Sequence, residues 1–420
     1  MSKRISILLV ILLLLFLYSF FIIGKAGIGK QFVKNYIWDY VPQKIQIIMK
    51  LIINDRLVNN FNNDYNVKFL PQTQFEDLQF SRIDLDFLSK GSPSSNYLAT
   101  SGLYSFFIEK IDNQSFLVVN DNAEIYKLDV SYLSNKNKKN YQKLETNINV
   151  KKVLDTFILN NEIFLSFVYN GYECDKFKIM RAKLNKKKLV FSNFFSIKEC
   201  GSYIQGGRMQ NYIHNNQEGL LFTTGDNPPD SPNNKSQKAD SIYGKVIFKG
   251  FNSDQFEIFS LGHRNPQGLI VKENLILITE HGPKGGDEIN KILFKKNYGW
   301  PIASYGDTYK PINNYKYKKN HTNNGFEEPI YSFIPSIGIS EIIQIPNSFS
   351  KKWIDNFIVS SLFGRSIYRI KFDKEFNKVI YVEKIYIGER IRDIKYFENQ
   401  NLILLALEEK GQIGIISNLK

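Results

Sequence analysis

Apolar and polar positions alternate in short runs along most of the chain, and these runs recur in six similar units. Each unit opens with a polar leading segment and continues through strand-like apolar runs separated by turns and polar loops. The units start 51, 53, 56, 76 and 52 residues apart, at Gly102, Val153, Gly206, Gly262, Gly338 and Arg390. A period near 50 residues with about four strands per unit is typical of a β-propeller. We therefore predict an all-β fold, a six-bladed β-propeller over residues 66–420, in which each blade packs on its neighbours.

The polar leading segments predict the position of a binding site. In a propeller they point to one face, around the mouth of the central channel. Four of them are expected to converge there: Gly206–Arg208, Arg264–Gln267, Ser336–Glu341 and Arg390–Asp393. Convergent polar groups at the mouth of a channel form a typical ligand site.

An apolar stretch of nineteen residues, Ile5–Ile23, follows Lys3 and Arg4. At about 1.5 Å per residue a helix of this length nearly spans a hydrocarbon core of about 30 Å. An uncleaved transmembrane signal-anchor over residues 1–24 is favoured over a cleaved signal peptide, because the run is long and Gly24–Gly27 is a weak cleavage site. The leading positive charges predict an inner-membrane anchor with the propeller on the periplasmic side.

Residues 25–65 contain a second helical pattern, in which Ile45, Ile48, Ile52 and Leu57 recur at the spacing of one helix face. We expect an amphipathic juxtamembrane helix there. It either lies on the membrane surface or packs against the propeller.

The composition supports a mostly β protein, since Ile, Phe and Tyr favour strands while Asn and Gly favour turns. The formal net charge is +14, but the lysines are scattered in short loop groups and form no basic helix or stripe. A solvated basic surface is favoured over nucleic-acid binding, with attraction to anionic lipid as a further alternative.

The two cysteines, Cys174 and Cys200, form no C-x-x-C motif. Each follows a strand-like run, Ile163–Tyr172 or Leu189–Lys198, and adjacent strands can bring such positions together. A disulfide is favoured over two unrelated thiols, and it requires an oxidising compartment.

Candidate functional residues are most frequent in Gly262–Pro301, where two polar clusters flank the apolar run Leu275–Thr279. The first cluster contains Arg264, Asn265 and Gln267, and the second contains His281, Gly282, Pro283, Asp287 and Glu288. Charged, amide and glycine residues at both ends of a buried strand indicate a site on a rigid scaffold.

Several motifs resemble the quinoprotein aldose dehydrogenases, the soluble glucose and sorbosone dehydrogenase family. The motifs are GHRNPQG from Gly262, EHGPKGGDEIN from Glu280, NYGWP from Asn297, GGRM from Gly206, TTGD from Thr223, SLFGRSIYRI from Ser361 and RIRD from Arg390. The resemblance covers roughly residues 95–420. It implies a six-bladed propeller that uses pyrroloquinoline quinone (PQQ) and calcium to oxidise a small sugar or alcohol.

The resemblance also implies roles for particular residues. Arg264 and Asn265 would lie near the quinone oxygens with Gln267 in support, and Arg390 and Arg392 would bind the carboxylates of PQQ. The alternative for the arginines is ordinary salt bridging in the channel.

For calcium, the resemblance implies two sets of oxygen ligands. The carbonyls of Gly282 and Pro283 would hold the calcium that orients PQQ. A second calcium site would map to Glu288, Tyr298, Asp307 and Tyr309. The alternative for Glu288 is an ion pair with a lysine such as Lys284.

The chain departs from the family at the catalytic base. The family has a histidine in an H-x-x-G-R element, and here Ile204 occupies that position before Arg208. Two further departures are Glu341, which places a carboxylate near the cofactor mouth, and Phe363, which stands where some members carry a cofactor-contacting lysine.

Two functions remain open. The first is an exported, membrane-anchored PQQ-dependent dehydrogenase of aldose sugars or related alcohols, with Glu341 or Asp393 as an unusual base. The second is a propeller that has lost the oxidation chemistry and acts as a ligand-binding or scaffold module. The sequence does not identify the electron acceptor.

Overall fold

The computed structural model describes residues 78–90, 103–134, 141–171, 173–184, 187–231, 233–308 and 316–418. All of them belong to one unit of the chain, Val67–Lys420. The expected anchor (1–24), the expected juxtamembrane helix (25–65) and Tyr309 lie outside the described residues. Within the described ranges, no helix has the length and apolar character needed to cross a membrane.

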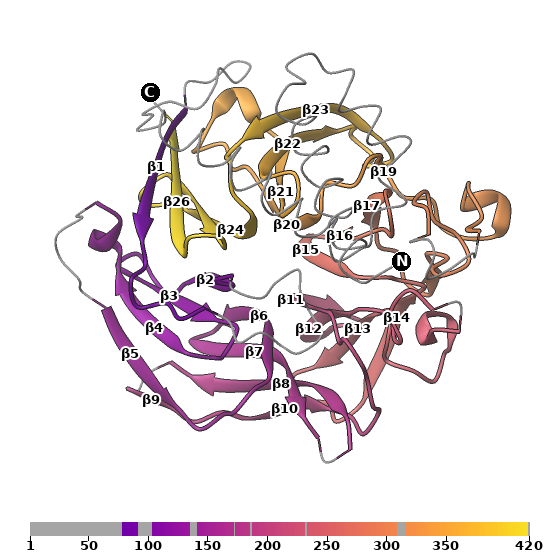
Figure 1. Cartoon of the computed structure of the whole chain (residues 1–420), viewed down its shortest axis with the longest axis horizontal. Helices are drawn as coiled ribbons and strands as arrows, with labels where there is room; N and C mark the ends of the chain where they lie inside the picture. Colours follow the sequence, from indigo (N-terminus) through magenta and orange to yellow (C-terminus); the bar gives the residue numbers. More distant parts are fainter. Residues whose placement is uncertain are drawn as a thin grey trace, which may run out of the picture. The chain divides into compact units, whose positions relative to one another are not determined.

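The described strands form six mainly antiparallel sheets arranged around a central axis (Figure 1), which confirms the predicted six-bladed β-propeller. Blades 1 to 3 follow one another along the chain. Blade 1 contains β2 (Phe106–Lys110), β3 (Ser115–Asn120), β4 (Ile125–Asp129), β5 (Tyr141–Thr146) and β9 (Lys188–Leu189). Blade 2 contains β6 (Lys152–Leu159), β7 (Glu162–Asn170), β8 (Asp175–Lys183) and β10 (Ser192–Ser196). Blade 3 contains β11 (Gly206–His214), β12 (Gln217–Thr224), β13 (Lys245–Gly250), β14 (Phe256–Leu261) and β18 (Lys296–Asn297). The short outer strands β9 and β18 pair in parallel with β5 and β14.

Blades 4 to 6 complete the ring. Blade 4 contains β15 (Pro266–Lys272), β16 (Leu275–Glu280), β17 (Asp287–Lys291) and β19 (Tyr331–Phe333). Blade 5 contains β20 (Ile339–Gln344), β21 (Asn356–Ser361), β22 (Ser366–Phe372) and β23 (Val379–Tyr386). Blade 6 contains β24 (Ile391–Phe397), β25 (Leu402–Leu407), β26 (Gln412–Asn418) and β1 (Leu78–Asp84). Four short 3₁₀ helices lie in the described loops: η3 (Val130–Leu133), η4 (Lys235–Gln237), η5 (Thr322–Asn324) and η6 (Lys351–Trp353).

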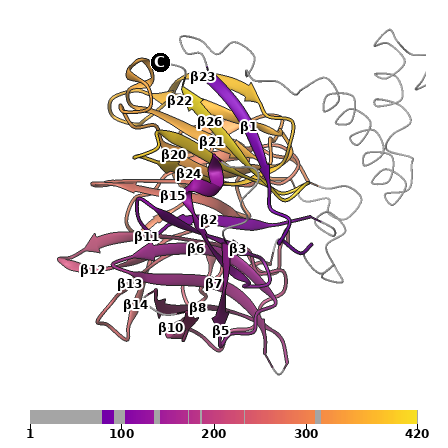
Figure 2. The same cartoon turned by 90° about the vertical axis from the view of Figure 1, so that its left-hand side faces the viewer.

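Blade 6 closes the ring with strands from both ends of the propeller (Figure 2). β1 pairs antiparallel with β26, from Leu78 opposite Asn418 to Asp84 opposite Gln412. The repeat pattern alone does not predict this closure, because β1 lies outside the six repeated units.

Buried apolar residues hold neighbouring blades together. Each of the six blade interfaces has its own cluster, so the core is divided around the ring. Between blades 5 and 6, for example, Trp353 and Ile358 pack with Ile394 and Leu405. This sheet-on-sheet burial makes the scaffold rigid where the channel-lining strands begin.

The first strands of the blades line the channel and contact one another around it (Figure 1). Five of them, β6, β11, β15, β20 and β24, have an irregular register near their start. A β-bulge bends its strand and redirects a side chain. These irregularities lie at Asp155, Arg208, Gln267, Glu341 and Asp393, which are the polar positions that the strands present near the channel.

Candidate functional site

Arg208 of blade 3 lies at the centre of a buried network that connects it to three other blades. Its Nη1 atom is 2.9 Å from Oδ1 of Asp155 on β6 and 2.8 Å from Oε2 of Glu341 on β20. Its Nη2 donates to the carbonyl oxygen of Arg392 on β24 at 3.2 Å. Only 2% of the Arg208 side chain is exposed, so these charges interact in a medium that screens them weakly. The contacts confirm that three of the four polar leading segments converge.

The same network continues on β2 and β24. Asp393 accepts from the backbone N–H of Ile108 at 2.9 Å and from that of Ile394 at 3.0 Å. Lys395 pairs with Glu109, with 2.8 Å between Nζ and Oε1. Four carboxylates and two cations therefore meet around the channel, and the backbone bonds to Asp393 join blade 6 to blade 1.

Burial controls the protonation of these carboxylates. It raises the pKa of Glu109 to about 8, even though Lys395 opposes the shift. It raises the pKa of Glu341 to about 7 and that of Asp155 to about 6, with Arg208 opposing both shifts. Near neutral pH the network thus binds protons that exposed carboxylates would have released.

Glu408 joins two of the predicted cofactor residues at the rim of the channel. Its Oε1 lies 2.6 Å from Nε of Arg392, and its Oε2 lies 3.1 Å from Nε of Arg390. Ser105 donates to the same carboxylate at 2.9 Å. Although burial opposes ionisation, the two arginines lower the pKa of Glu408 to about 2. The carboxylate is therefore ionised and holds both guanidinium groups in fixed positions.

Arg392 also connects blade 6 to blade 4. Its Nη1 donates to Oε1 of Gln267 at 2.9 Å, and Nε2 of Gln267 donates to Oδ1 of Asn265 at 2.8 Å. Four of the five predicted cofactor residues, Arg390, Arg392, Gln267 and Asn265, are thus linked through Glu408 into one set. We call this set, Glu408 included, the rim cluster.

Arg264, the fifth predicted cofactor residue, forms a separate group. Its Nη2 lies 2.8 Å from Oδ1 of Asp230, and its Nη1 donates to the carbonyl of His281 at 3.0 Å. Its guanidinium carbon lies 5.4 Å from the centre of the Trp300 ring. The indole N–H of Trp300 donates to Oδ2 of Asp226 at 2.8 Å.

Ile204, which the motif resemblance aligns with the family's histidine, has its side chain buried in the apolar cluster between blades 2 and 3. Gly201 packs directly against Ile204 and Tyr243, which leaves no room for a side chain at position 201. The environment of position 204 is apolar, so no proton acceptor replaces the histidine at that position.

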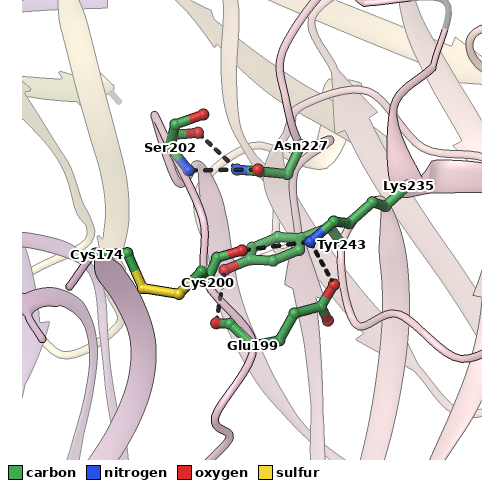
Figure 3. Close-up of a disulfide and its surroundings, with 7 residues drawn as sticks. All are labelled: Cys174, Glu199, Cys200, Ser202, Asn227, Lys235 and Tyr243. Carbon is green, nitrogen blue, oxygen red and sulfur yellow. Dashed lines mark hydrogen bonds and ion pairs between the residues drawn. A yellow bond between two sulfur atoms is a disulfide. The ribbon is translucent and has the colours of Figure 1, made fainter.

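The segment before Ile204 is fixed on two sides (Figure 3). The structure contains a disulfide between Cys174 and Cys200, with 5.6 Å between the Cα atoms, which confirms the predicted bridge. Lys235 pairs with Oε1 of Glu199 at 2.8 Å. Asn227 donates to the carbonyl of Ser202 at 2.6 Å. The segment is thus bound to blade 2 by the disulfide and to the long loop of blade 3 by polar contacts.

A buried lysine holds that long loop, residues 225–244, in place. Nζ of Lys245 donates to the backbone carbonyls of Lys235 at 3.0 Å, Ser236 at 2.9 Å and Tyr243 at 2.6 Å. Burial lowers the pKa of Lys245 to about 7. Sequence patterns did not reveal this residue, because a lysine at the start of a strand usually indicates an exposed edge.

The two histidines in the motifs that resemble the family, His263 and His281, form hydrogen bonds within the protein. His263 is fully buried between Glu280, 2.9 Å from Nδ1, and Ser260, 2.8 Å from Nε2. His281 has Nε2 at 2.5 Å from the carbonyl oxygen of Ile339, and burial lowers its pKa to about 4. Both ring nitrogens of His263 and Nε2 of His281 are therefore engaged in contacts within the protein.

The residues expected to bind calcium fall in two places. Gly282 and Pro283 open the loop after β16, where the N–H of Gly282 donates to Asp287 at 3.1 Å. Lys284 of this loop forms a backbone bridge with Asp307, which brings the loop beside the segment around Asp307. The carbonyls of Gly282 and Pro283 remain the predicted ligands.

The second expected calcium set is described only in part, because Tyr309 lies outside the described residues. The hydroxyl of Tyr298 donates to the carbonyl of Lys291 at 2.5 Å and accepts from the N–H of Leu293 at 2.9 Å. Glu288 contacts Asn290 at 3.3 Å and lies 3.8 Å from Nε2 of His321, so within the described residues it lies beside His321 and forms no ion pair with Lys284. Across the part of the chain that the structure describes, no three His, Cys, Asp or Glu side chains are grouped as metal ligands.

Sequence reasoning missed the residues that partner the predicted ones. Glu109, Asp155 and Lys395 interrupt otherwise apolar strands, and a charge at such a position is the signal that would have identified them. Glu408 had no comparable signal, because it follows β25 in a charged turn and is buried only through its two arginine partners.

A six-bladed ring with arginines and amides from different blades at one mouth of its channel is the architecture of propeller-type quinoprotein dehydrogenases. The sequence profile of one family, Glucose / Sorbosone dehydrogenase, matches residues 148–415, which is more than half of the chain. The chain belongs to the Glucose / Sorbosone dehydrogenase family.

Two relatives are similar in sequence. The uncharacterized protein slr1608 of Synechocystis sp. is 26% identical over 284 residues, which cover 61% of this chain and 67% of that protein. The aldose sugar dehydrogenase YliI of Escherichia coli is 31% identical over 165 residues, which cover 38% of this chain and 44% of that protein. The match to the second relative thus spans less than half of its length.

Solved structures share the fold. The soluble aldose sugar dehydrogenase of Escherichia coli, in its apo form, superposes with a TM-score of 0.65 at 20% identity, over 81% of this chain and 99% of that one. A PQQ-bound aldose sugar dehydrogenase of Streptomyces coelicolor superposes with a TM-score of 0.55 at 17% identity, over 81% of this chain and 99% of that one. At these identities the likeness establishes the fold alone.

Proposed function

We propose that this protein is an exported, membrane-anchored dehydrogenase that binds PQQ at the rim cluster and oxidises small aldose sugars or related alcohols. The observation that carries the proposal is the connection of Arg390, Arg392, Gln267 and Asn265 through Glu408. Family membership gives the reaction class, and the relatives named above give PQQ and aldoses as the chemistry to test.

The donors of the rim cluster fit a polycarboxylate. Both arginines face Glu408 through Nε, and within the described contacts the Nη atoms of Arg390 have no protein acceptor. A guanidinium held in this way presents its terminal N–H groups in the fork that matches a carboxylate. PQQ carries three carboxylates and supplies a two-electron acceptor when it is bound. Arg390 and Arg392 would bind it, and Gln267 and Asn265 would orient it.

The charge of Glu341 does not conflict with an anionic ligand. Its carboxylate is 2.8 Å from Arg208, and burial raises its pKa to about 7. The pairing and the partial protonation both reduce the negative field at the mouth. Phe363 is 68% exposed and leaves its position without a cation. The two rim arginines are therefore the main cations that the proposal assigns to ligand carboxylates.

The proposal keeps one of the two expected calcium sites. Carbonyl oxygens such as those of Gly282 and Pro283 are suitable ligands for a hard cation, and we retain them as the calcium ligands of the proposal. The second set is left out of the proposal, because the hydroxyl of Tyr298 is already bonded to the backbone of Lys291 and Leu293. We derive no role for a metal there.

Export is supported by the disulfide, since such bridges persist in oxidising compartments. The anchor over residues 1–24 and the periplasmic position of the propeller remain part of the proposal. Alkylation of the intact cells' protein with a membrane-impermeant thiol reagent, with and without reductant, tests the location. Labelling of Cys174 and Cys200 only after reduction from outside the inner membrane is the expected result.

The second candidate function is a ligand-binding module without oxidation chemistry. It is favoured by the burial of Ile204 in an apolar cluster, which leaves the family's base position without a proton acceptor. Loss of a general base typically costs about 10²–10⁴-fold in rate.

Reconstitution separates the two functions. Detergent-solubilised full-length protein is titrated with PQQ in the presence of calcium, followed by calorimetry and by the absorbance of PQQ. Reduction of an artificial dye is then measured with a panel of aldoses. Saturable binding that is lost in the Arg390→Ala/Arg392→Ala double variant, together with sugar-dependent dye reduction, supports the dehydrogenase. Binding without turnover supports the binding module, and absence of binding rejects both assignments of the rim cluster.

A further inference from the structure

Asp226 lies between the position of the missing histidine and a predicted cofactor residue. It closes the TTGD motif, directly after β12. The N–H of the preceding residue, Gly225, donates to the carbonyl of Gln205 at 2.8 Å, which fixes it to the segment containing Ile204. The N–H of Asp226 itself donates to the carbonyl of Arg264 at 2.6 Å. The backbone thus holds this aspartate at the junction of blades 3 and 4, beside both features.

The carboxylate of Asp226 is oriented through only one of its oxygens. Oδ2 accepts from the indole N–H of Trp300 at 2.8 Å and from the N–H of Asp230 at 3.1 Å. Among the described contacts, Oδ1 receives no hydrogen bond. A carboxylate fixed by two donors on one oxygen presents the other in a defined direction, as a positioned proton acceptor requires.

The charged groups that face Asp226 are Arg264, from the segment before β15, and Asp230, from its own loop. Burial raises the pKa of Asp226 to about 7, Arg264 opposes the shift and Asp230 adds to it. A carboxylate that titrates near the working pH is a much better base than an ordinary aspartate. Asp226 is 1% exposed, and the Arg264–Asp230 ion pair lies beside it.

The two carboxylates considered from the sequence, Glu341 and Asp393, are less suitable. Both oxygens of Asp393 accept backbone N–H bonds, from Ile108 and Ile394. In Glu341, Oε2 pairs with Arg208 and Oε1 accepts from the N–H of Ile342 at 2.8 Å. Each is therefore fully engaged in the buried network that holds the blades together.

We propose that Asp226 is the catalytic base of this protein and takes the proton that the family's histidine would take. The inference rests on the proposed function. The hydroxyl of the substrate gives its proton to Oδ1 of Asp226, while the hydrogen on the same carbon leaves with its electron pair to an ortho-quinone oxidant. The substrate carbon becomes a carbonyl. A bound ortho-quinone would accept this hydride and take one proton from solvent, and Asp226 then returns the hydroxyl proton of the substrate to solvent.

The proposal requires that the substrate reach Asp226. The Arg264 guanidinium is held by Asp230, which lies beside that carboxylate. Under the proposal, an anionic ligand that drew Arg264 away from Asp230 would give the substrate access to Asp226.

The test compares wild type, Asp226→Asn and Asp254→Asn. Asn at 226 keeps the size of the side chain and removes the base, and Asp254 is an exposed aspartate that serves as the matched control. Asp226→Asn is expected to lower kcat by about 10²–10⁴-fold, to leave PQQ affinity within about threefold, and to abolish the rise of kcat with pH near 7. The second readout needs no cofactor: pH-difference infrared spectra of the ligand-free protein should contain a carboxyl band that titrates near pH 7 and is absent only in Asp226→Asn.

The outcomes separate this inference from the proposed function. If wild type turns over and Asp226→Asn retains both its rate and its pH profile, Asp226 is not the base and the dehydrogenase assignment stands. An infrared titration unaltered by Asp226→Asn also rejects the inference. If wild type binds no PQQ, the proposed function fails and the inference fails with it. Thermal melting checks that Asp226→Asn folds, and if it does not, Asp226→Glu must retain the titrating band and part of the activity.

Discussion

Nη1 of Arg208 on blade 3 lies 2.8 Å from Oε2 of Glu341 on blade 5, so two blades that are not neighbours in the ring meet at its centre. Asp155 of blade 2 binds the same nitrogen at 2.9 Å. Ion pairs between charged side chains of different blades therefore span the channel of this propeller. This pairing connects the parts of the chain that carry the candidate site.

Arg208→Met should be strongly destabilising. It leaves Asp155 and Glu341 buried without their cation, and loss of one partner of a buried pair costs about 3–5 kcal/mol in the free energy of unfolding. Urea unfolding followed by tryptophan fluorescence measures it. The matched control is Arg181→Met, because Arg181 is partly exposed and lies 3.6 Å from Glu162. The control should lose about 1 kcal/mol or less, and equal losses in the two variants would contradict the role of Arg208.

Glu408→Gln should remove part of the acid sensitivity of the fold. The pKa of Glu408 is lowered from 4.5 to about 2, so its stabilisation is present above pH 4.5 and is lost as the pH falls through about 2. At about 1.4 kcal/mol per pKa unit the contribution is on the order of 3 kcal/mol at neutral pH. Urea midpoints between pH 2 and pH 7 measure it. A variant with the same acid dependence as wild type would show that the rim arginines do not depend on Glu408.

Lys245→Met should loosen the loop 225–244. The substitution leaves three backbone carbonyls without their common donor, at a cost of about 1–3 kcal/mol for each carbonyl that water does not reach. Hydrogen exchange is the sharper measurement, because protection should fall at Asp226 and Tyr243 and remain unchanged in blades 5 and 6. Uniform loss of protection throughout the ring would indicate a general effect on stability instead.

Removing the disulfide should destabilise the protein by about 2–4 kcal/mol, as expected for a bridge that closes a loop of this length. The bridge joins residues 26 positions apart, and no free cysteine is present among the described residues. Wild type should therefore give no reaction with a thiol reagent in denaturant until reductant is added. The Cys174→Ser/Cys200→Ser variant tests stability, and an unchanged unfolding midpoint would mean that Glu199–Lys235 and Asn227–Ser202 suffice to hold the segment.

Ile204→His should fail to restore a base. The side chain at 204 is packed among apolar residues of blades 2 and 3, so an imidazole there loses its hydration and its pKa falls. The variant should be less stable than wild type, and its kcat should not rise. A gain of more than about tenfold in kcat would show instead that the missing histidine alone limits the reaction.

The repeat pattern predicted the fold because each blade is formed mainly by one continuous stretch of the chain. Within each stretch, apolar strands alternate with polar turns, as expected for a sheet that is buried on both faces. Position 208 was assigned to the channel because the leading segments share one face. The ion pairs of Arg208 were not predictable, because Asp155 and Glu341 lie 53 and 133 positions away and only the closed ring brings them together. Glu408 was missed for the same reason.

For the candidate site, the sequence predicted which residues come together more accurately than it predicted the contacts of each residue. Arg390, Arg392, Gln267 and Asn265 come together as their shared face implies. Tyr298 was expected to be part of a calcium site, and the structure shows its hydroxyl bonded to the backbone of Lys291 and Leu293. Motif similarity gives the position of a side chain along the chain, whereas its direction depends on neighbours that the motif does not contain.

Pairing of Leu78 with Asn418 has a consequence for the order of events during synthesis. Blades 1 to 5 can form as the polypeptide emerges, but the sixth blade needs both β1, which precedes them in the chain, and β24 to β26, which follow them. Until β26 pairs with β1, blade 6 is incomplete and the ring is open. The rim cluster contains Arg390, Arg392 and Glu408 of blade 6, so it is complete only after the five other blades have been made.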